Sequence, residues 1–274
     1  MTLFDAFRYN GKRALVVGGA TGMGAAVAEL ALDAGAEVVV MDRAEVTLGG
    51  AKAIHLDLAE KSSIESAVDD CGGPVHALFS CAGVADGTPG IERINFIGHR
   101  YLIERMLGSG MLPHGSAIGM ISSAAGMGWE GTLPEELEFL DITDFDQAVR
   151  WAQDHNHADY LWSKKAINAY VAREAFGLLK KGIRINAIMP GPTDTPLAQA
   201  NKELWLGFGA DYRAELGIEA AAPLEQAYPL VFLCSDAASG ITGITMITDA
   251  GYFGSGVTGS FPAAKDVIGF LRSV

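Results

Sequence analysis

The stretch VVGGATGMGAAVAELA, residues 16–31, joins the end of an apolar run to an Ala-rich segment typical of a helix. Gly18, Gly22 and Gly24 lie between the two. Glycines in such a turn let the backbone approach a phosphate closely, and the following helix directs its N-terminus at that phosphate. The spacing alone could mark a flexible turn, but a strand before it and a helix after it are the context that a dinucleotide site requires.

Apolar, β-branched runs alternate with helical patterns along the rest of the chain. The runs are apolar on both faces, as parallel strands covered by helices must be. The alternation predicts one α/β domain with a doubly wound, parallel, seven-stranded sheet and helices on both faces. The predicted strands are 13–17, 37–41, 53–56, 76–80, 118–122, 183–189 and 244–248. The predicted helices include 23–34, 90–107, 158–180, 223–234 and one opened by a capping box at Ser62-x-x-Glu65.

Composition excludes several classes of protein. Hydrophobic residues make up 49% of the 274 residues, enough for a large core, but no apolar run reaches the length of about 18 residues that predicts a membrane span. A formal charge of −13 opposes nucleic-acid binding, which requires a basic surface. The three cysteines share no metal-ligand spacing, and His155 and His157 are interpreted as a polar loop, so no metal site is predicted. With no signal-peptide pattern, we expect a cytoplasmic protein.

The end of the second predicted strand indicates which cofactor is preferred. Asp42 lies 18 residues beyond Gly24 and is followed by Arg43. A carboxylate here can accept hydrogen bonds from both ribose hydroxyls of NAD and would repel the extra phosphate of NADP. The Arg43 guanidinium could receive that phosphate, which keeps NADP open as the alternative. The sequence favours NAD.

Tyr160 and Lys164 lie four residues apart in a stretch with a helical pattern, HADYLWSKKAINAYVAREAF (157–176). Residues at this spacing share one face of a helix. A Lys ammonium beside a Tyr hydroxyl favours the phenolate, so we expect a lowered pKa for Tyr160. The same spacing also arises by chance on exposed helices, and it does not establish a catalytic pair alone.

Further motifs resemble those of the short-chain dehydrogenase/reductase family, in the family's order and over nearly the whole chain. Val17 stands where the family's glycine motif usually has Thr, and Ser80-Cys81-Ala82-Gly83 stands for the usual Asn-Asn-Ala-Gly. The remaining matches are Gly18-x-x-x-Gly22-Met23-Gly24, Asp57-Leu58, Asn95-Phe96-Ile97-Gly98, Ile121-Ser122-Ser123-Ala124-Ala125-Gly126, Tyr160-x-x-x-Lys164 and Pro190-Gly191-Pro192-Thr193-Asp194-Thr195.

The resemblance implies a Rossmann domain that binds NAD and interconverts alcohols and carbonyls. It implies that Tyr160 exchanges the substrate's proton and that Ser123 orients the substrate oxygen. By the same resemblance, Lys164 holds the nicotinamide ribose and Asn95 holds a water that links Lys164 to solvent. The implied cofactor contacts are Gly18, Thr21, Gly22, Met23, Gly24, Asp42, Arg43, Asp57, Leu58, Cys81, Ala82, Gly83, Tyr160, Lys164, Pro190, Gly191, Thr193 and Thr195.

A long segment of about 127–158 separates Ser123 from Tyr160, as in the family subset that resembles bacterial 3α-hydroxysteroid dehydrogenase/carbonyl reductase. Its acidic residues predict a solvated outer face. We expect it beside the helix that follows Tyr160, where it would favour a homodimer over a homotetramer. Helix starts are predicted at Thr132-x-x-Glu135 and Thr143-x-x-Asp146, and an amphipathic face at Phe145, Ala148, Val149 and Ala152.

The segment 197–218 is rich in apolar and aromatic residues, and in the family this region covers the substrate. It favours a bulky apolar secondary or aryl alcohol, such as a hydroxysteroid, a terpenoid or an aromatic alcohol. The tail 254–274 ends in an amphipathic helical pattern that packs on a neighbour or rims the pocket. The alternatives are an NADP-preferring carbonyl reductase and a catalytically silent NAD-binding regulatory protein. An enoyl reductase is disfavoured, because that branch spaces its Tyr and Lys further apart.

Overall fold

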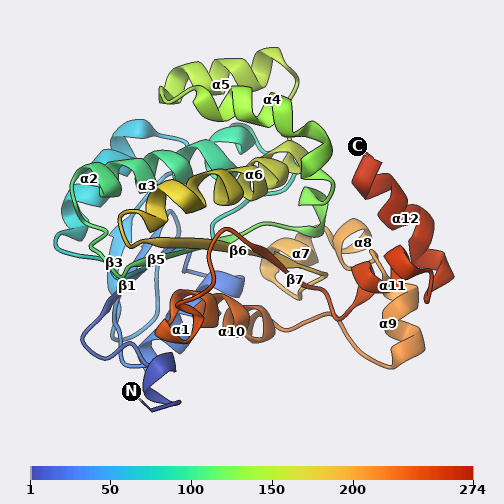
Figure 1. Cartoon of the computed structure of the whole chain (residues 1–274), viewed down its shortest axis with the longest axis horizontal. Helices are drawn as coiled ribbons and strands as arrows, with labels where there is room; N and C mark the ends of the chain where they lie inside the picture. Colours follow the sequence, from blue (N-terminus) through green and yellow to red (C-terminus); the bar gives the residue numbers. More distant parts are fainter. Residues whose placement is uncertain (1, 274) are drawn as a thin grey trace.

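A seven-stranded parallel sheet runs through the centre of the computed structural model, which describes residues 2–273 (Figure 1). The strands lie in the order β3-β2-β1-β4-β5-β6-β7. Because β2 and β4 flank β1, the chain reverses its direction of winding there, and open α/β sheets bind ligands at such a point. The strands are β1 (Arg13–Val17), β2 (Glu37–Asp42), β3 (Lys52–His55), β4 (Ala77–Ser80), β5 (Ala117–Ile121), β6 (Arg184–Pro190) and β7 (Thr245–Thr248).

Helices cover both faces of the sheet, as the sequence predicted (Figure 1). Alternate side chains of β1 enter two separate cores: Leu15 and Val17 pack in one, Ala14 and Val16 in the other. One face carries α1 (Gly22–Asp33) and α10 (Pro223–Cys234). The other carries α2 (Lys61–Cys71), the π-helix η2 (Arg93–Ile97), α3 (Gly98–Gly108) and α6 (Tyr160–Leu179). Within residues 2–273, no helix is long and apolar enough to cross a membrane.

The predicted capping box at Ser62 is wrong. Helix α2 begins at Lys61, so Ser62 lies inside the helix, and no side-chain hydrogen bond caps its start. The Glu65 carboxylate instead accepts a hydrogen bond of 2.6 Å from the Tyr101 hydroxyl on α3. Glu65 therefore bonds across to α3 and not back to the backbone at the start of α2, as a capping box would require.

The long segment before Tyr160 folds into two helices, α4 (Trp129–Asp141) and α5 (Phe145–Asp154). Helix α4 packs along α6, and α5 buries the predicted Phe145, Ala148, Val149 and Ala152. Both predicted starts are wrong. Thr132 lies inside α4, and the N-cap of α5 is Asp144, whose carboxylate accepts a 2.9 Å bond from the Gln147 N–H.

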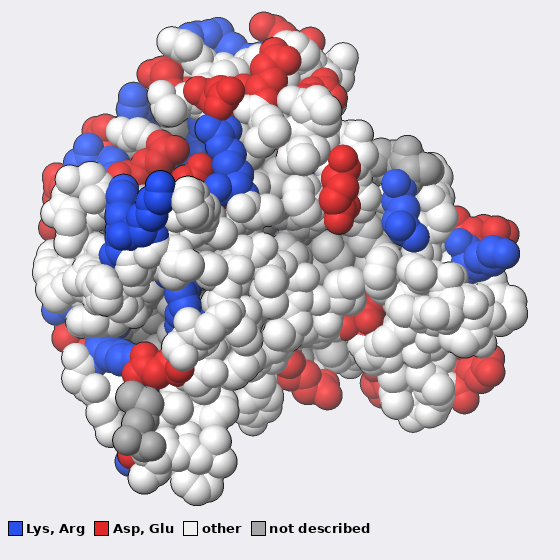
Figure 2. Space-filling view, viewed as in Figure 1, with Lys and Arg blue, Asp and Glu red and all other residues white. Residues whose placement is uncertain are grey.

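Acidic side chains gather over α4 and α5, at the top of Figure 2. One of them departs from the predicted solvated face, because Glu136 is fully buried. The Thr132 hydroxyl donates to Glu136 Oε1 at 2.9 Å. Burial raises the pKa of Glu136 to about 8, against the lowering effects of Thr132 and the Lys165 charge.

The chain after β6 builds a third, smaller core. Tyr212 packs edge-on against Tyr252 and Phe261, with ring centroids 5.4 and 5.1 Å away. The predicted C-terminal helix is present, and it buries Ala264 and Ile268 in this core. The helices here are α7 (Pro196–Ala200), α8 (Lys202–Trp205), α9 (Ala210–Leu216), α11 (Tyr252–Thr258) and α12 (Pro262–Ser273).

Candidate active site

The turn between β1 and α1 needs glycine at two positions. Gly18 has a φ of +83°, and a Cβ there would lie 2.4 Å from the Ala82 Cα. A Cβ on Gly24 would lie 2.0 Å from the Gly18 carbonyl oxygen. The turn is thus packed directly on the segment after β4, and its backbone stays open toward the carboxyl edge of the sheet.

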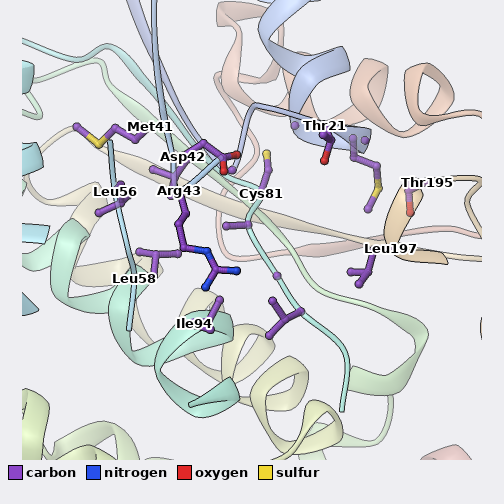
Figure 3. Close-up of a pocket in the computed structure, with 18 of the residues that line it drawn as sticks. Thr21, Met41, Asp42, Arg43, Leu56, Leu58, Cys81, Ile94, Thr195 and Leu197 are labelled. Atoms are coloured by element: carbon purple, nitrogen blue, oxygen red, sulfur yellow. The ribbon is translucent and has the colours of Figure 1, made fainter. Parts of the chain in front are cut away.

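A pocket lies at this edge, between the glycine turn and the ends of β2 and β4 (Figure 3). Residues 195–197, at the start of α7, close it on a further side. The predicted cofactor residues that line it are Gly18, Thr21, Gly22, Met23, Gly24, Asp42, Arg43, Asp57, Leu58, Cys81, Ala82, Gly83 and Thr195. The cofactor contacts implied by the sequence did not include Val17, Met41, Leu56, Val84, Ile94, Pro196 or Leu197, although Val17 belongs to the glycine motif and Met41 lies near a strand end.

Asp42 and Arg43 present opposite charges to this pocket. The Asp42 carboxylate accepts one backbone hydrogen bond on each oxygen, from Ala20 N at 2.9 Å and Ala44 N at 2.8 Å. A carboxylate oxygen can accept a second bond, so two acceptor positions are left for hydroxyl groups. The exposed Arg43 side chain extends from the end of β2 toward Ile94 (Figure 3). The residues therefore fit a dinucleotide, with an acceptor pair for a ribose and a backbone cradle for phosphates.

The segment after β6 is divided between two cavities. Thr195 lines the pocket and caps α7, where its hydroxyl accepts from Ala198 N at 3.1 Å. Gly191 instead lines a second cavity together with Tyr212, and the buried Thr193 hydroxyl donates to the Gly191 carbonyl at 2.9 Å. Pro190 ends β6 and borders neither cavity. Cofactor contacts by Pro190, Gly191 and Thr193 remain predictions.

Tyr160 is the first residue of α6, and Ser123 directly follows Ser122 beyond the end of β5. The Ser123 hydroxyl is within hydrogen-bonding reach of the Tyr160 phenol. One turn further along α6, the Lys164 ammonium lies 5.4 Å from the centroid of the Tyr160 ring. The structure thus brings three of the four residues predicted to be catalytic to one place.

The predicted lowering of the Tyr160 pKa by Lys164 is wrong. Burial raises the pKa of Tyr160 to about 12, the Ser123 hydrogen bond lowers it, and the Asp86 charge raises it. The Lys164 ammonium is buried and donates to the Ile121 carbonyl at 2.9 Å, and desolvation lowers its own pKa to about 8. The lowering of the Tyr160 pKa that the charge of an oxidised nicotinamide would cause remains a prediction.

Asn95 lies in the π-helix η2. Helices of this form are rare overall, and those that occur are frequently found at functional sites. Its amide accepts from Val84 N at 2.8 Å and donates to the Val84 carbonyl at 3.0 Å. A Cβ on Gly83 would lie 3.5 Å from Asn95 Oδ1 and 3.7 Å from Lys164 Nζ. Asn95 and Lys164 therefore flank the same glycine, next to the pocket.

An aromatic side chain from segment 197–218, which the sequence predicted to cover the substrate, reaches the candidate active site. The Trp205 ring at the end of α8 contacts the Tyr160 ring, with centroids 5.0 Å apart and planes tilted by 46°. The residues described hold no group of three or more His, Cys, Asp or Glu side chains that could bind a metal ion. The site is built from a phenol, a hydroxyl, an ammonium and an indole.

Comparison with known proteins gives consistent matches. Residues 12–132 match the short chain dehydrogenase family, and residues 142–253 match the family described as enoyl-(acyl carrier protein) reductase. The chain is 30% identical over 257 residues to cis-4-hydroxycyclohexanecarboxylate dehydrogenase of Sinomonas cyclohexanicum, covering 87% of this chain and 95% of that one.

Two hydroxysteroid dehydrogenases are also similar to the chain. The 3-alpha-hydroxysteroid dehydrogenase/carbonyl reductase of Comamonas testosteroni is 29% identical, with 86% of this chain and 95% of that one covered. The crystal structure of 3-alpha-hydroxysteroid dehydrogenase from Pseudomonas sp. B-0831, complexed with NADH, superimposes with a TM-score of 0.71 at 28% identity, over 87% of this chain and 95% of that one. The chain belongs to the short-chain dehydrogenase/reductase family of oxidoreductases, which bind a nicotinamide cofactor.

Proposed function

We propose that this protein is an NAD(H)-dependent oxidoreductase that interconverts a bulky, apolar secondary or aryl alcohol and its carbonyl. The observation that carries the proposal is the convergence of Ser123, Tyr160 and Lys164 beside the pocket that the glycine turn, Asp42 and Arg43 line. The names of two similar proteins support it, since they describe hydroxysteroid dehydrogenases. The name of the hydroxycyclohexanecarboxylate dehydrogenase supports the oxidation of a ring alcohol but not an apolar substrate, because that substrate carries a carboxylate. Although residues 142–253 match a family described by enoyl reductases, the Tyr–Lys spacing of four residues favours alcohol chemistry.

The chain's own residues would manage the proton of this reaction. Ser123 and Tyr160 lie close enough to contact one substrate oxygen together, so Ser123 would orient the alcohol. Tyr160 would first lose its own proton to solvent, and the resulting phenolate would then take the proton of the alcohol. A bound nicotinamide would accept or supply the hydride. Lys164, whose ammonium also lies beside Gly83 in the pocket wall, would hold the cofactor's ribose. Trp205 would form an apolar wall against the substrate ring.

The preference for NAD is supported by the two acceptor positions that Asp42 leaves toward the pocket. Arg43 supports the alternative, a preference for NADP, since its guanidinium extends along the same pocket and suits a phosphate. Initial rates with saturating alcohol and either NAD⁺ or NADP⁺ distinguish them. We expect a higher kcat/KM with NAD⁺, and the reverse ratio would favour the NADP-preferring reductase.

The test of the function is NAD⁺ reduction with a panel of sterols, terpenoid alcohols, cyclohexanols and aryl alcohols. We expect turnover by the wild type and by Tyr228→Phe, which alters an exposed tyrosine, and a loss of at least about 100-fold in Tyr160→Phe. NADH binding, followed by fluorescence, should be equal in all three proteins. Normal NADH binding without turnover of any alcohol would favour the silent regulatory protein.

The cellular setting and the assembly follow the same line of reasoning. All three cysteines are free thiols, which supports a reducing, cytoplasmic location. The helices α4 and α5 pack on α6 and α3. We infer that they cover a side on which another subunit would otherwise pack, which favours a homodimer over a homotetramer.

A further inference from the structure

The backbone of Tyr160 is held by side chains at both of its peptide groups. Its N–H donates to Asp86 Oδ1 at 2.7 Å, and its carbonyl accepts from Ser163 Oγ at 2.7 Å. The first N–H groups of a helix have no partner inside the helix, and a carboxylate there also interacts favourably with the helix dipole. The N-cap of α6 is Asp159, whose carboxylate accepts from the Trp162 N–H at 2.8 Å, and Asp86 adds a second carboxylate at the helix start, on the N–H of the residue whose phenol lies in the candidate active site.

Asp86 belongs to the segment that forms one wall of the pocket. Residues 81–84 line that wall, and Asn95 holds Val84 through two hydrogen bonds. Two residues later, Asp86 ties the same segment to Tyr160 across 74 positions of the chain. One carboxylate thus links the segment that forms the pocket wall to the backbone of Tyr160.

The Asp86 carboxylate also acts as a charge on the reacting group. Burial is the main cause that raises the pKa of Tyr160, and the negative charge of Asp86 adds to it. The ammonium of Lys164 contacts the Ile121 carbonyl and makes no ion pair with Asp86. Asp86 is exposed, so solvent screens its charge, and its repulsion of a carboxylate on a substrate bound against the phenol would depend on the distance between the two carboxylates.

We propose that Asp86 is a positioning residue for Tyr160 and a determinant of substrate charge, favouring uncharged alcohols over alcohols that carry a carboxylate on the ring being oxidised. The inference rests on the proposed function and narrows its substrate class. Two like charges about 7 Å apart near a protein surface repel enough to lower a second-order rate constant about tenfold. The pair cis-4-hydroxycyclohexanecarboxylate and its carboxamide differs in charge and hardly in shape, so it isolates this effect.

The test compares kcat/KM for that pair in the wild type, Asp86→Asn and Asp86→Ala. Asn keeps an oxygen that can accept from the Tyr160 N–H and removes the charge. We expect the preference for the carboxamide to fall about tenfold in both variants. We also expect kcat to fall at least about tenfold in Asp86→Ala, with most of that loss restored in Asp86→Asn. The control Asp33→Asn removes an exposed charge at the end of α1 and should leave the preference unchanged.

An unchanged preference in Asp86→Asn would overturn the charge selection. The positioning is measured without catalysis, by hydrogen exchange of the Tyr160 amide: we expect protection in the wild type and Asp86→Asn and faster exchange in Asp86→Ala. Equal exchange rates of the Tyr160 amide in all three proteins would overturn the positioning role of Asp86. If the wild type oxidises no alcohol, the proposed function fails. The charge selection is then tested by the affinities of the NADH complex for the carboxylate and the carboxamide. An affinity ratio that is the same in the wild type and Asp86→Asn would overturn the charge selection.

Discussion

Replacing Glu136 with Gln should remove most of the pH dependence of stability that this side chain creates. Glu136 is fully buried in α4, its Oε1 accepts from Thr132, and its Oε2 has no hydrogen-bond partner among the residues described. Its pKa is about 8, above the ordinary value of 4.5. The folded state therefore binds this proton more tightly than the unfolded state does. The corresponding stability is fully present below pH 4.5 and is lost as the pH rises through 8.

The two pKa values set the size of the effect. A difference of about 3.5 at roughly 1.4 kcal/mol for each pKa unit gives an upper limit of about 5 kcal/mol. Structural relaxation around a buried charge reduces this, and we expect about 2–4 kcal/mol. Gln keeps the acceptor for Thr132 and places an unpaired NH₂ group at the buried position, which costs about 1–3 kcal/mol at every pH. The variant should be less stable than the wild type at pH 5 and equal or more stable at pH 9.

The assay is urea unfolding followed by tryptophan fluorescence, at pH intervals from 5 to 9. The quantity of interest is the difference in unfolding free energy between wild type and Glu136→Gln. His99 also titrates, because burial lowers its pKa to about 4, but its contribution is common to both proteins and cancels. Glu29→Gln, an exposed change on α1, is the control. A difference that stays constant within about 0.5 kcal/mol from pH 5 to 9 would refute the reasoning.

Four further outcomes are expected. Gly18→Ala should abolish measurable NADH binding and lower stability by about 2–4 kcal/mol, because its Cβ would overlap Ala82, whereas Gly49→Ala, with open space around it, should change neither. Asp42→Ser should shift the ratio of kcat/KM for NAD⁺ over NADP⁺ by at least about 100-fold, since two charge-assisted bonds are lost and a repulsion disappears. Trp205→Ala should lower kcat/KM about tenfold for ring alcohols and far less for 2-propanol, because an aromatic contact worth about 1–1.5 kcal/mol is removed; equal losses would contradict this. Light scattering should give the mass of a dimer, and a mass of four subunits would count against the covering role of α4 and α5.

The periodicity of the sequence predicted the sheet and the helices that cover it. The bounds of α10 agree with the prediction at both ends, and the second strand differs by a single residue. Buried parallel strands and helices of this length are determined mainly by their own apolar patterns, which a sequence displays directly. The glycine turn was also predictable, because only glycine can occupy positions as close to another backbone as Gly18 and Gly24.

What the sequence did not reveal depends on contacts between distant segments. The spacing of Tyr160 and Lys164 indicated their shared face correctly, but nothing local indicated that the ammonium would turn to the Ile121 carbonyl. Glu136 is one acid among many in its segment, and only the packing of α4 on α6 makes it buried. Asp86 shows no motif at all, and its contact with Tyr160 arises from the way in which the sheet brings β4 and α6 together.

The short distance between Ser123 and Tyr160 has a consequence for how such proteins diversify. Because the two side chains are within hydrogen-bonding reach, the chain between them leaves and re-enters the molecule at nearly the same point. A segment with adjacent ends can be lengthened, shortened or exchanged for another without displacing either flanking residue, and doubling its length costs only about 0.6 kcal/mol of closure entropy. The segment that forms α4 and α5 is therefore a position that tolerates insertions. New helices and new surfaces can be added there while the Tyr160 phenol and the Ser123 hydroxyl keep their positions.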